Sequence, residues 1–569
     1  MISDRVVTEF NQLIQEEWDY RMQAEPIMAT MYGDHRFNDR LPPASEAAYL
    51  FRRQSLQDFQ ARLQALGRTG LSPTEQLNYA IFSRYLQSEI DELRFRADRM
   101  PISKTGGFHT DFPELPRFVP LGTADDYANY IARLAAFERF VDENIERMRS
   151  GLDGGQIPAR VTLEGVSDSI HPHIVSDPED SLLYTPLKNF PTSVPAQEQP
   201  GLQKAARVVI QESVVTGYQR LLDFVENEYL PASQENIGAA SLPDGEEFYR
   251  HRIRYFTSLT LTPEEIHRTG HEEVSRIRAD MEANIRKSGF DGDFRAFVEF
   301  LRRDPRFYAT SPEALLKEVA FVLKKMDGEL PRLFKTLPRL PYGIRSVPDY
   351  AAPYATTAYY FPSSGDGTRA GMYYVNTYDL PSRPLYEIEA LSLHEAVPGH
   401  HLQIALQQEL EELPGFRRFV GYTGFSTAYI EGWALYAERL GLEVGFYQDP
   451  YSDFGRLSYE MWRACRLVVD TGIHALGWTR QQAIDFMADN TSSTLLNIAN
   501  EVDRYIAWPG QALAYKIGEL KMRELRSRTE EAMGSRFDLR QFHDLILSSG
   551  PLPLDLLEES VNDWLRKNG

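Results

Sequence analysis

The sequence contains little cysteine, no long hydrophobic run and no excess of basic residues. Its 569 residues include a single cysteine, Cys465, which can form no internal disulfide and so fits a reducing cytoplasm. No stretch reaches the roughly 18 apolar residues that indicate a membrane span. The first 20 residues lack the basic region and apolar run of a secretory signal. We therefore expect a cytoplasmic protein with no membrane partner.

Acidic residues outnumber basic ones, 82 to 61, and give a formal net charge of −21. They are spread along the whole chain and are not gathered in a tail. A protein that binds nucleic acid needs a basic face to neutralise phosphates, so we expect no nucleic-acid partner. The sequence gives no indication of the oligomeric state.

Most of the chain shows helical periodicity, with apolar positions three and four residues apart. A chain of 569 residues also exceeds the roughly 250–300 at which one hydrophobic core stops growing. We therefore predict two helical lobes, residues 1–245 and 246–569, divided within the proline- and glycine-rich segment 231–247. The class is mainly α, with helices predicted over residues 3–25, 45–66, 73–97, 124–150, 201–229, 262–288, 312–330, 385–412, 427–445, 455–476, 479–490 and 511–530.

Residues 354–383 depart from the helical pattern. Two aromatic and β-branched runs flank a Ser/Gly/Asp turn, which predicts a β-hairpin. An edge strand there would hold an extended peptide by main-chain hydrogen bonds, and Tyr373 and Tyr374 are the candidate substrate-binding residues on it. The alternative is a hairpin that only caps the lobe.

The segment "SLHEAVPGHHLQ", residues 392–403, follows directly. His394 and Glu395 begin as in H-E-x-x-H, the helical motif in which two histidines bind zinc and the glutamate acts on a water. The next histidines, His400 and His401, stand six and seven residues after His394. Seven residues of an undistorted helix rise about 10.5 Å, too far for two rings to reach one metal. A zinc site therefore requires a distortion of the helix.

Pro398 and Gly399 lie where that distortion is needed, because proline cannot donate the helical hydrogen bond and glycine accepts unusual backbone angles. With two residues looped out, His400 takes the last position of H-E-x-x-H. The alternative is a helix that ends near Val397 and a new one that starts at Gly399, with the histidines acting as hydrogen-bonding groups.

A second helix offers the third ligand. In "AYIEGWALYAERL", residues 428–440, Glu431 and Glu438 are seven apart and share one face of an otherwise apolar helix. We predict Glu431 as the ligand and Glu438 as a supporting residue. The alternative is that either carboxylate pairs with an arginine.

Polar residues on two later segments complete the candidate set. Arg463, Arg466, Asp470 and His474 form a stripe along one helix, and Tyr515 and Lys516 follow a Pro-Gly break. A tyrosine or histidine donor beside zinc would stabilise an oxyanion, so His474 and Tyr515 are catalytic candidates. Arg463, Arg466 and Lys516 are candidate substrate-binding residues, although an Arg466–Asp470 pair also satisfies the pattern. A further pair, His267 and His271, is interpreted as part of an exposed helix without metal.

The segments "LHEAVPGHHLQ", "EGWALYAE", "RLVVDTGIHALGW" and "WPGQALAYKIG" resemble the signatures of the bacterial family of domain of unknown function 885, grouped with the gluzincin zinc metallopeptidases. A more distant similarity is to thimet oligopeptidase, neurolysin and angiotensin-converting enzyme. The resemblance implies a mostly helical body with two lobes around a deep cleft, zinc at its floor and cleavage of short peptides. The two-residue insertion before His400 is a departure from the distant peptidases.

We therefore predict a zinc-dependent peptidase acting on oligopeptides, with His394, His400 and Glu431 as Zn²⁺ ligands and Glu395 as general base. Two alternatives remain. One is a zinc hydrolase of other amides or of esters, and the other is a peptide-binding protein with this fold and no turnover.

Overall fold

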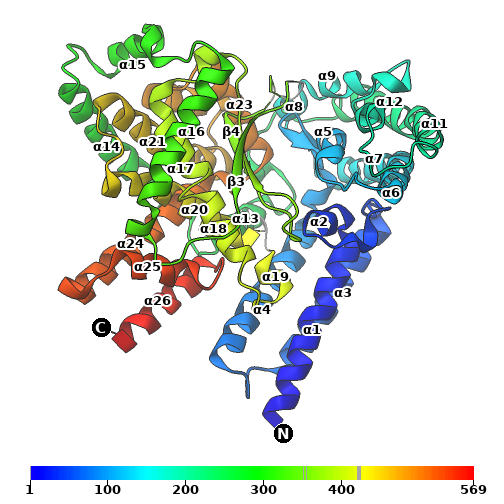
Figure 1. The fold of residues 1–569 in the computed structure, drawn as a ribbon, viewed down its shortest axis with the longest axis horizontal. Coiled ribbons are helices and arrows are strands. Elements are labelled where there is room, and N and C mark those ends of the chain that lie inside the picture. Colours follow the sequence, from blue (N-terminus) through cyan, green and yellow to red (C-terminus); the bar gives the residue numbers. More distant parts are fainter. Residues whose placement is uncertain (1, 350–351, 354, 420–423, 569) are drawn as a thin grey trace. The chain divides into compact units, whose positions relative to one another are not determined.

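The computed structural model describes residues 2–349, 352–353, 355–419 and 424–568 (Figure 1). It is mainly helical, as the sequence predicts, and the described residues form only one two-stranded and one three-stranded sheet. The chain divides into two compact units, Met1–Phe248 and Tyr249–Gly569. The predicted boundary after residue 245 falls close to this division.

The N-terminal unit is built from helices, short 3-10 turns and the two-stranded antiparallel sheet of β1 (Ile102–Ser103) and β2 (Gly106–Gly107). Its core packs Phe112, Phe137 and Tyr218, with the rings of Phe112 and Phe137 stacked 3.9 Å apart. Ser72 begins one of the long helices with a capping box, in which Ser72 and Glu75 satisfy each other's backbone N–H groups. Its main helices are α1 (Ile2–Ala24), α3 (Glu46–Leu66), α4 (Pro73–Phe95), α6 (Ala124–Ala135), α7 (Phe137–Gly154), α11 (Gln199–Val209) and α12 (Thr216–Phe224).

The C-terminal unit carries the predicted site. Its longest helices, α14 and α21, pack tightly, because a Cβ at Gly270 would lie 2.7 Å from Val468 Cγ2. Its main helices are α14 (Pro263–Lys287), α15 (Phe294–Arg303), α16 (Pro312–Leu333), α17 (Ile388–Glu395), α18 (His400–Gln408), α20 (Gly424–Leu440), α21 (Pro450–Ala475), α22 (Arg480–Asn490), α23 (Leu495–Ala507), α24 (Ala514–Met533), α25 (Leu539–Leu547) and α26 (Leu554–Asn568).

The predicted hairpin is present. Strands β4 (Ala358–Phe361) and β5 (Gly371–Val375) pair in antiparallel register, and Tyr360 faces Tyr373. Residue 354, at the start of the predicted segment, lies outside the described residues. A third strand, β3 (Tyr342–Ser346), was not predicted and pairs with β5 in parallel, so the order is β3-β5-β4.

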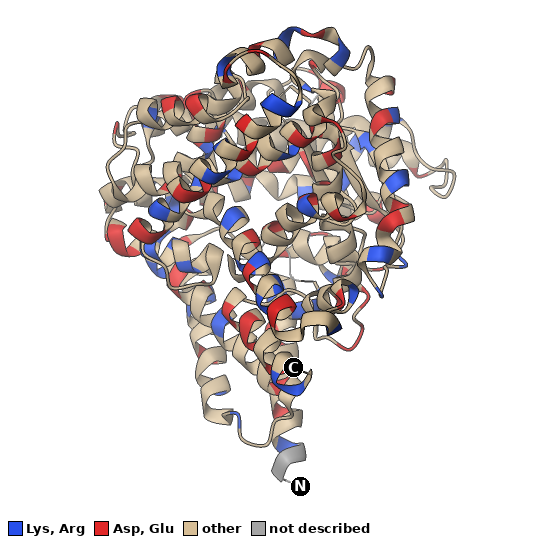
Figure 2. Cartoon of the chain, turned by 90° about the vertical axis from the view of Figure 1, so that its left-hand side faces the viewer, with Lys and Arg blue, Asp and Glu red and all other residues tan. Residues whose placement is uncertain are grey.

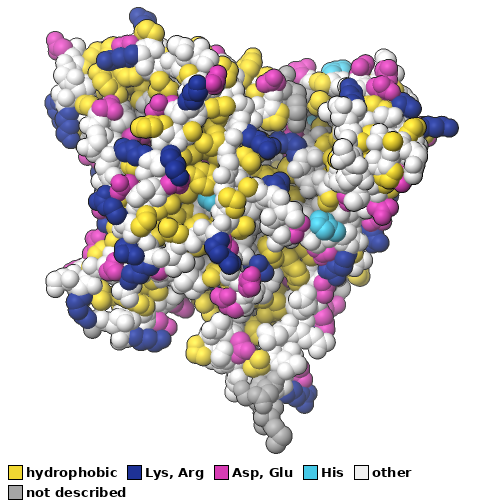
Figure 3. Space-filling view, in the orientation of Figure 1, with side chains coloured by type: hydrophobic (Ala, Val, Ile, Leu, Met, Phe, Trp, Pro, Cys, Tyr) yellow, Lys and Arg dark blue, Asp and Glu magenta, His cyan; other side chains and the backbone are white. Residues whose placement is uncertain are grey.

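The surface is mixed in character. On the side drawn in Figure 2, acidic and basic residues alternate along the helices. In Figure 3, hydrophobic side chains of the C-terminal unit gather over α16, α17 and β3, and a histidine is visible among them. Within the described part of the chain, no helix combines the length and the apolar character needed to cross a membrane.

Candidate metal centre

The predicted helix over residues 385–412 is interrupted where the sequence places Pro398 and Gly399. Helix α17 ends at Glu395 and α18 begins at His400. The backbone N–H of Leu402 donates to the carbonyl of Ala396 at 3.4 Å, across six residues where an α-helix spans four. The helix ends and a new one starts, as one interpretation of the sequence has it. Two extra residues are also accommodated between His394 and His400, as the other has it.

Glycine is required at position 399. A Cβ there would lie 1.9 Å from the carbonyl oxygen of His394 and 2.4 Å from that of Leu393, closer than any side chain permits. The Val397–Pro398 peptide is cis, and the Trp433 indole N–H donates to the Pro398 carbonyl at 2.9 Å. The hydrogen bond from Trp433 holds the linker against α20.

Three donor atoms converge at this break. Glu431 Oε2, from α20, lies 3.7 Å from His394 Nε2 and 3.5 Å from His400 Nε2. All three ligand atoms lie within 4.8 Å of one another, and the three residues are buried. Two ligands that are each about 2.1 Å from a tetrahedral ion are about 3.4 Å apart, so the spacing suits a shared metal ion.

A metal would also bind a carboxylate oxygen that lies at ion-pair distance from two imidazoles and is not hydrogen-bonded. Glu431 Oε2 is buried and accepts no hydrogen bond from the described residues, an expensive arrangement for a carboxylate. Burial raises the pKa of Glu431, but His394 and His400 outweigh burial and bring it well below its usual range. Two imidazoles and one carboxylate form a donor set that catalytic zinc uses, so these residues fit Zn²⁺.

Glu438 orients the first histidine. Its carboxylate lies 2.7 Å from His394 Nδ1, which leaves Nε2 directed at Glu431. Burial lowers the pKa of His394, but Glu431 and Glu438 outweigh burial and raise it to about 9. Metal-binding histidines are commonly held in this way by a carboxylate on the other ring nitrogen. The supporting role predicted for Glu438 agrees with this contact.

Glu395 lies beside the three donors and does not join them. Its side chain is 9% exposed, and no described residue gives it a hydrogen bond or an ion pair. Burial, and then the charge of Glu395, raise the pKa of the Tyr373 hydroxyl, which places Tyr373 near this carboxylate. A carboxylate that is next to a candidate metal site and has no hydrogen-bond partner among the described residues is available to exchange protons with a water or a substrate.

His401 has a different environment from His400. Its Nδ1 lies 2.9 Å from the hydroxyl of Tyr360, and its ring packs 4.6 Å from that of Tyr342. Burial lowers the pKa of His401 to about 4. Successive residues of a helix point about 100° apart, so only one of the two adjacent histidines faces Glu431.

Tyr515 lies on the Glu431 side of the site. Helices α20 and α24 pack closely at Gly432 and Gly518, where a Cβ on Gly432 would lie 2.4 Å from the Gly518 carbonyl carbon. This contact puts Tyr515, one turn earlier on α24, near Glu431. Burial raises the pKa of Tyr515, and the charge of Glu431 raises it further. Tyr515 is partly exposed, so its hydroxyl is a candidate donor to a bound substrate.

Arg466 lies beside Tyr515, with its guanidinium carbon 4.5 Å from the centre of that ring. Arg466 and Arg504 share a single carboxylate, that of Glu501, at 3.1 and 3.0 Å. Asp470, predicted as a possible partner of Arg466, instead accepts from Tyr249 and from the backbone of Gly510. Two guanidinium groups, those of Arg466 and Arg504, therefore share one carboxylate close to Tyr515.

The environments of four predicted site residues differ from those expected, and these residues are Arg463, His474, Tyr374 and Lys516. Arg463 is buried and lies 3.5 Å from Glu438, so it supports the residue that orients His394 and is not placed to bind substrate. His474 is buried, and its Nε2 donates to the carbonyl of Tyr505 at 2.9 Å. Burial lowers the pKa of His474 to about 4. His474 is thus a neutral group that positions the chain before α24, and this corrects its catalytic assignment.

Strand alternation corrects a second assignment. Tyr373 is fully buried on the face of β5 that is near Glu395, whereas Tyr374 points to the opposite face and stacks 5.0 Å from Tyr359. The two tyrosines cannot both line the site, and only Tyr373 is close to it.

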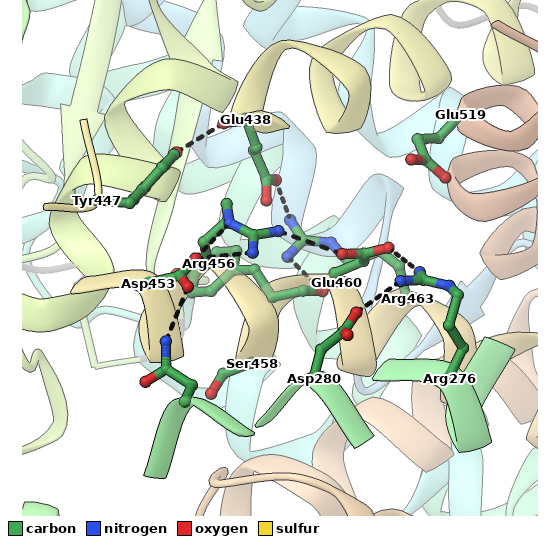
Figure 4. A network of polar contacts seen from close by, with 12 residues as sticks. Arg276, Asp280, Glu438, Tyr447, Asp453, Arg456, Ser458, Glu460, Arg463 and Glu519 are labelled. Atoms are coloured by element: carbon green, nitrogen blue, oxygen red, sulfur yellow. Dashed lines mark hydrogen bonds and ion pairs between the residues drawn. The ribbon is translucent and has the colours of Figure 1, made fainter. Parts of the chain in front are cut away.

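Lys516 is a structural residue. Its side chain is 0% exposed, and its ammonium lies 3.0 Å from Glu273, 2.9 Å from Glu460 and 2.9 Å from Glu519. Figure 4 shows the neighbouring contacts, with Glu460 paired with Arg276 and Arg456 and with Glu438 facing Arg463. The network joins α14, α21 and α24, and it leaves Lys516 no N–H for a substrate.

We expect Lys516→Met to lower the free energy of unfolding by about 3–5 kcal/mol, because it leaves buried carboxylates without their cation. Metal content should not change. The control is Lys521→Met on the same helix, whose partly exposed pairs with Glu524 and Glu558 should contribute about 1 kcal/mol or less. Urea unfolding of the two metal-loaded variants measures the difference, and equal losses would contradict the structural role of Lys516.

The sequence did not reveal the contacts by which three residues hold their neighbours in place. Trp433, Tyr360 and Asp470 hold, respectively, the Pro398 carbonyl, the His401 ring and the Gly510 backbone. Asp470 was visible as one position of the polar stripe. For Trp433 and Tyr360, no local pattern distinguishes a hydrogen-bonding ring from an ordinary core aromatic.

A helical chain with a buried His-His-Glu cluster across a broken helix matches a known family. The chain belongs to the family described as "Bacterial protein of unknown function (DUF885)", which matches residues 26–561. A crystal structure from Colwellia psychrerythraea, described as a "putative lipoprotein", is 28% identical, with a TM-score of 0.92 and 100% of both chains covered.

A structure from Shewanella oneidensis, described as a "putative lipoprotein of unknown function", is 19% identical, with a TM-score of 0.68. It covers 97% of this chain and 99% of its own, and at this identity the likeness shows the fold alone. No curated protein matches the chain.

Proposed function

We propose that this protein is a zinc-dependent peptidase that hydrolyses short peptides. The convergence of His394 Nε2, His400 Nε2 and Glu431 Oε2 beside the unpaired carboxylate of Glu395 is the observation that supports it. Zn²⁺ in such a site would polarise the scissile carbonyl and activate a water at neutral pH. The predicted membership of the gluzincin peptidases belongs to the same proposal.

In this proposal three side chains have separate roles in the reaction. Glu395 accepts a proton from the attacking water on its carboxylate and passes it to the nitrogen of the leaving amine. Tyr515 donates its hydroxyl hydrogen to the oxygen of the scissile carbonyl as negative charge develops there. Glu438 keeps the Nδ1 proton of His394 in place, so that His394 Nε2 keeps a free lone pair.

The substrate class follows from the surroundings of the centre. Arg466 and Arg504 share one carboxylate beside Tyr515, and guanidinium groups suit the carboxylate at the end of an oligopeptide. A cytoplasmic location without nucleic-acid or membrane partners stays a prediction. The relative that is 28% identical is described as a "putative lipoprotein", so a lipid-anchored location is the alternative.

A mass-spectrometric screen of a peptide library tests the proposal. We expect cleavage by the zinc-loaded protein, loss of cleavage after chelation and recovery when Zn²⁺ is added back. Peptide pairs that differ only in a free or amidated C-terminus separate carboxypeptidase from endopeptidase action. A zinc-loaded protein that binds peptides and cleaves none would favour the inactive binding protein, and cleavage of only esters or non-peptide amides would favour the other hydrolase.

A further inference from the structure

A second pair of histidines lies on α14, outside the candidate metal centre. His267 and His271 are one helical turn apart, and their Nε2 atoms are 3.1 Å from each other. His267 is half-buried and His271 is exposed. The sequence favoured an ordinary exposed helix here, because the neighbouring Glu272 does not fit the H-E-x-x-H arrangement. The side chains nevertheless bring two imidazole nitrogens together at the surface.

The ring of His267 is held from its other side by α21. Its Nδ1 lies 3.1 Å from the carbonyl oxygen of Val468 and 2.9 Å from the hydroxyl oxygen of Thr471. The Thr471 hydroxyl donates to the Leu467 carbonyl at 2.6 Å, so both atoms facing Nδ1 are acceptors. Nδ1 therefore carries the proton, and Nε2 presents its lone pair to His271. This is how metal-binding histidines are usually oriented.

The contact between the two rings is by itself an N–H···N hydrogen bond, with His271 as donor. Because His271 is exposed, water can carry its proton from Nε2 to Nδ1. The ring only changes tautomer and stays neutral. Both Nε2 lone pairs then converge on the space beside the helix. The backbone beneath them is fixed, because α14 meets α21 at Gly270, where a Cβ would lie 3.0 Å from the Val468 amide nitrogen.

The separation of the two nitrogens indicates which ion fits. Two ligand atoms about 2.1 Å from one ion are roughly 3.1 Å apart when the angle at the ion is about 95°, and about 3.4 Å apart at a tetrahedral angle. An angle near 90° is the preference of Cu²⁺ and Ni²⁺, for which imidazole is a favoured ligand. We propose that His267 and His271 form a second metal site that binds Cu²⁺ or Ni²⁺, with water completing the coordination.

This site differs from the candidate centre in three respects. It has two protein ligands instead of three, its two nitrogens are closer than the 3.5 and 3.7 Å measured around Glu431, and it is open to solvent. A bound ion would connect His271 to His267, which is already hydrogen-bonded to α21. The melting temperature should therefore rise when the ion binds, since a ligand of the folded state alone stabilises that state.

The test uses the full chain with Ni²⁺ as the probe. In a His400→Ala background, which removes a ligand of the candidate centre, calorimetry should detect Ni²⁺ binding and a higher melting temperature. Adding His271→Gln should weaken this binding by more than about 100-fold, since even the loss of an outer partner costs 10–100-fold. The matched control is His171→Gln, which changes an exposed histidine that lies 3.8 Å from Glu226, and it should leave Ni²⁺ binding unchanged.

A second measurement keeps the test independent of the His400→Ala variant. One equivalent of Cu²⁺ added to the zinc-loaded wild-type chain should show electron paramagnetic resonance couplings from two imidazole nitrogens, and His271→Gln should remove one of them. The proposal is overturned if His271→Gln leaves Ni²⁺ affinity unchanged, if His171→Gln lowers it equally, or if the wild-type spectrum shows no pair of nitrogens. None of these results depends on peptide hydrolysis.

Discussion

Glu395→Gln is expected to lower kcat/KM for peptide hydrolysis by about 10²- to 10⁴-fold, the usual contribution of a general base, while metal content stays at the wild-type level. The substitution preserves the size of the side chain, and an amide cannot accept the proton of the attacking water. Metal should be retained because the three donor atoms that converge belong to His394, His400 and Glu431. Steady-state kinetics and elemental analysis of the same preparation measure both quantities.

Glu438→Gln is the matched control, because it changes the other carboxylate next to His394. Glu438 holds His394 Nδ1 at 2.7 Å, so this variant should bind zinc about 10–100-fold more weakly and regain activity when zinc is saturating. The two variants thus separate proton transfer from ligand orientation. Wild-type turnover by Glu395→Gln would show that another group activates the water, and loss of its zinc would make Glu395 a ligand.

The sequence indicated the His-His-Glu cluster because the types and the spacing of these residues are typical of a zinc site. Pro398 and Gly399 stand where a helix must be broken, and the structure accommodates two extra residues there. The β-hairpin was predictable for the same reason, since alternation and turn residues are local. Strand β3 was not, because its partner β5 lies about 30 residues later and pairing at that distance leaves no local pattern.

Burial explains the assignments that changed. Lys516 and His474 lie on segments that do approach the centre, and the sequence cannot show that Lys516 is enclosed by Glu273, Glu460 and Glu519. A charged or polar residue on an apolar helix has the same pattern whether it faces a substrate or a buried partner. His474 belongs to the second group, since it donates to a backbone carbonyl. Only the packing of α21 against the chain before α24 distinguishes the two cases.

His400→Ala is expected to lose zinc affinity, whereas His401→Ala is expected to lose stability. His400 supplies one of three donor atoms, so its loss should weaken zinc binding by more than the roughly 100-fold that outer partners can cost. His401→Ala should keep its zinc and lower the free energy of unfolding by about 1–3 kcal/mol, because the buried hydroxyl of Tyr360 loses its hydrogen bond with His401. Zinc titration and urea unfolding of both variants provide the comparison.

The reason is geometric and rests on the break before α18. His400 is the first residue of that helix and His401 the second, so their side chains point about 100° apart. His400 Nε2 lies 3.5 Å from Glu431 Oε2, whereas His401 contacts Tyr342 and Tyr360 of the neighbouring sheet. The opposite ranking of zinc affinities would make His401 the ligand. It would also require three extra residues between the helices instead of two, and the hydrogen bond from Leu402 to Ala396 could not then form.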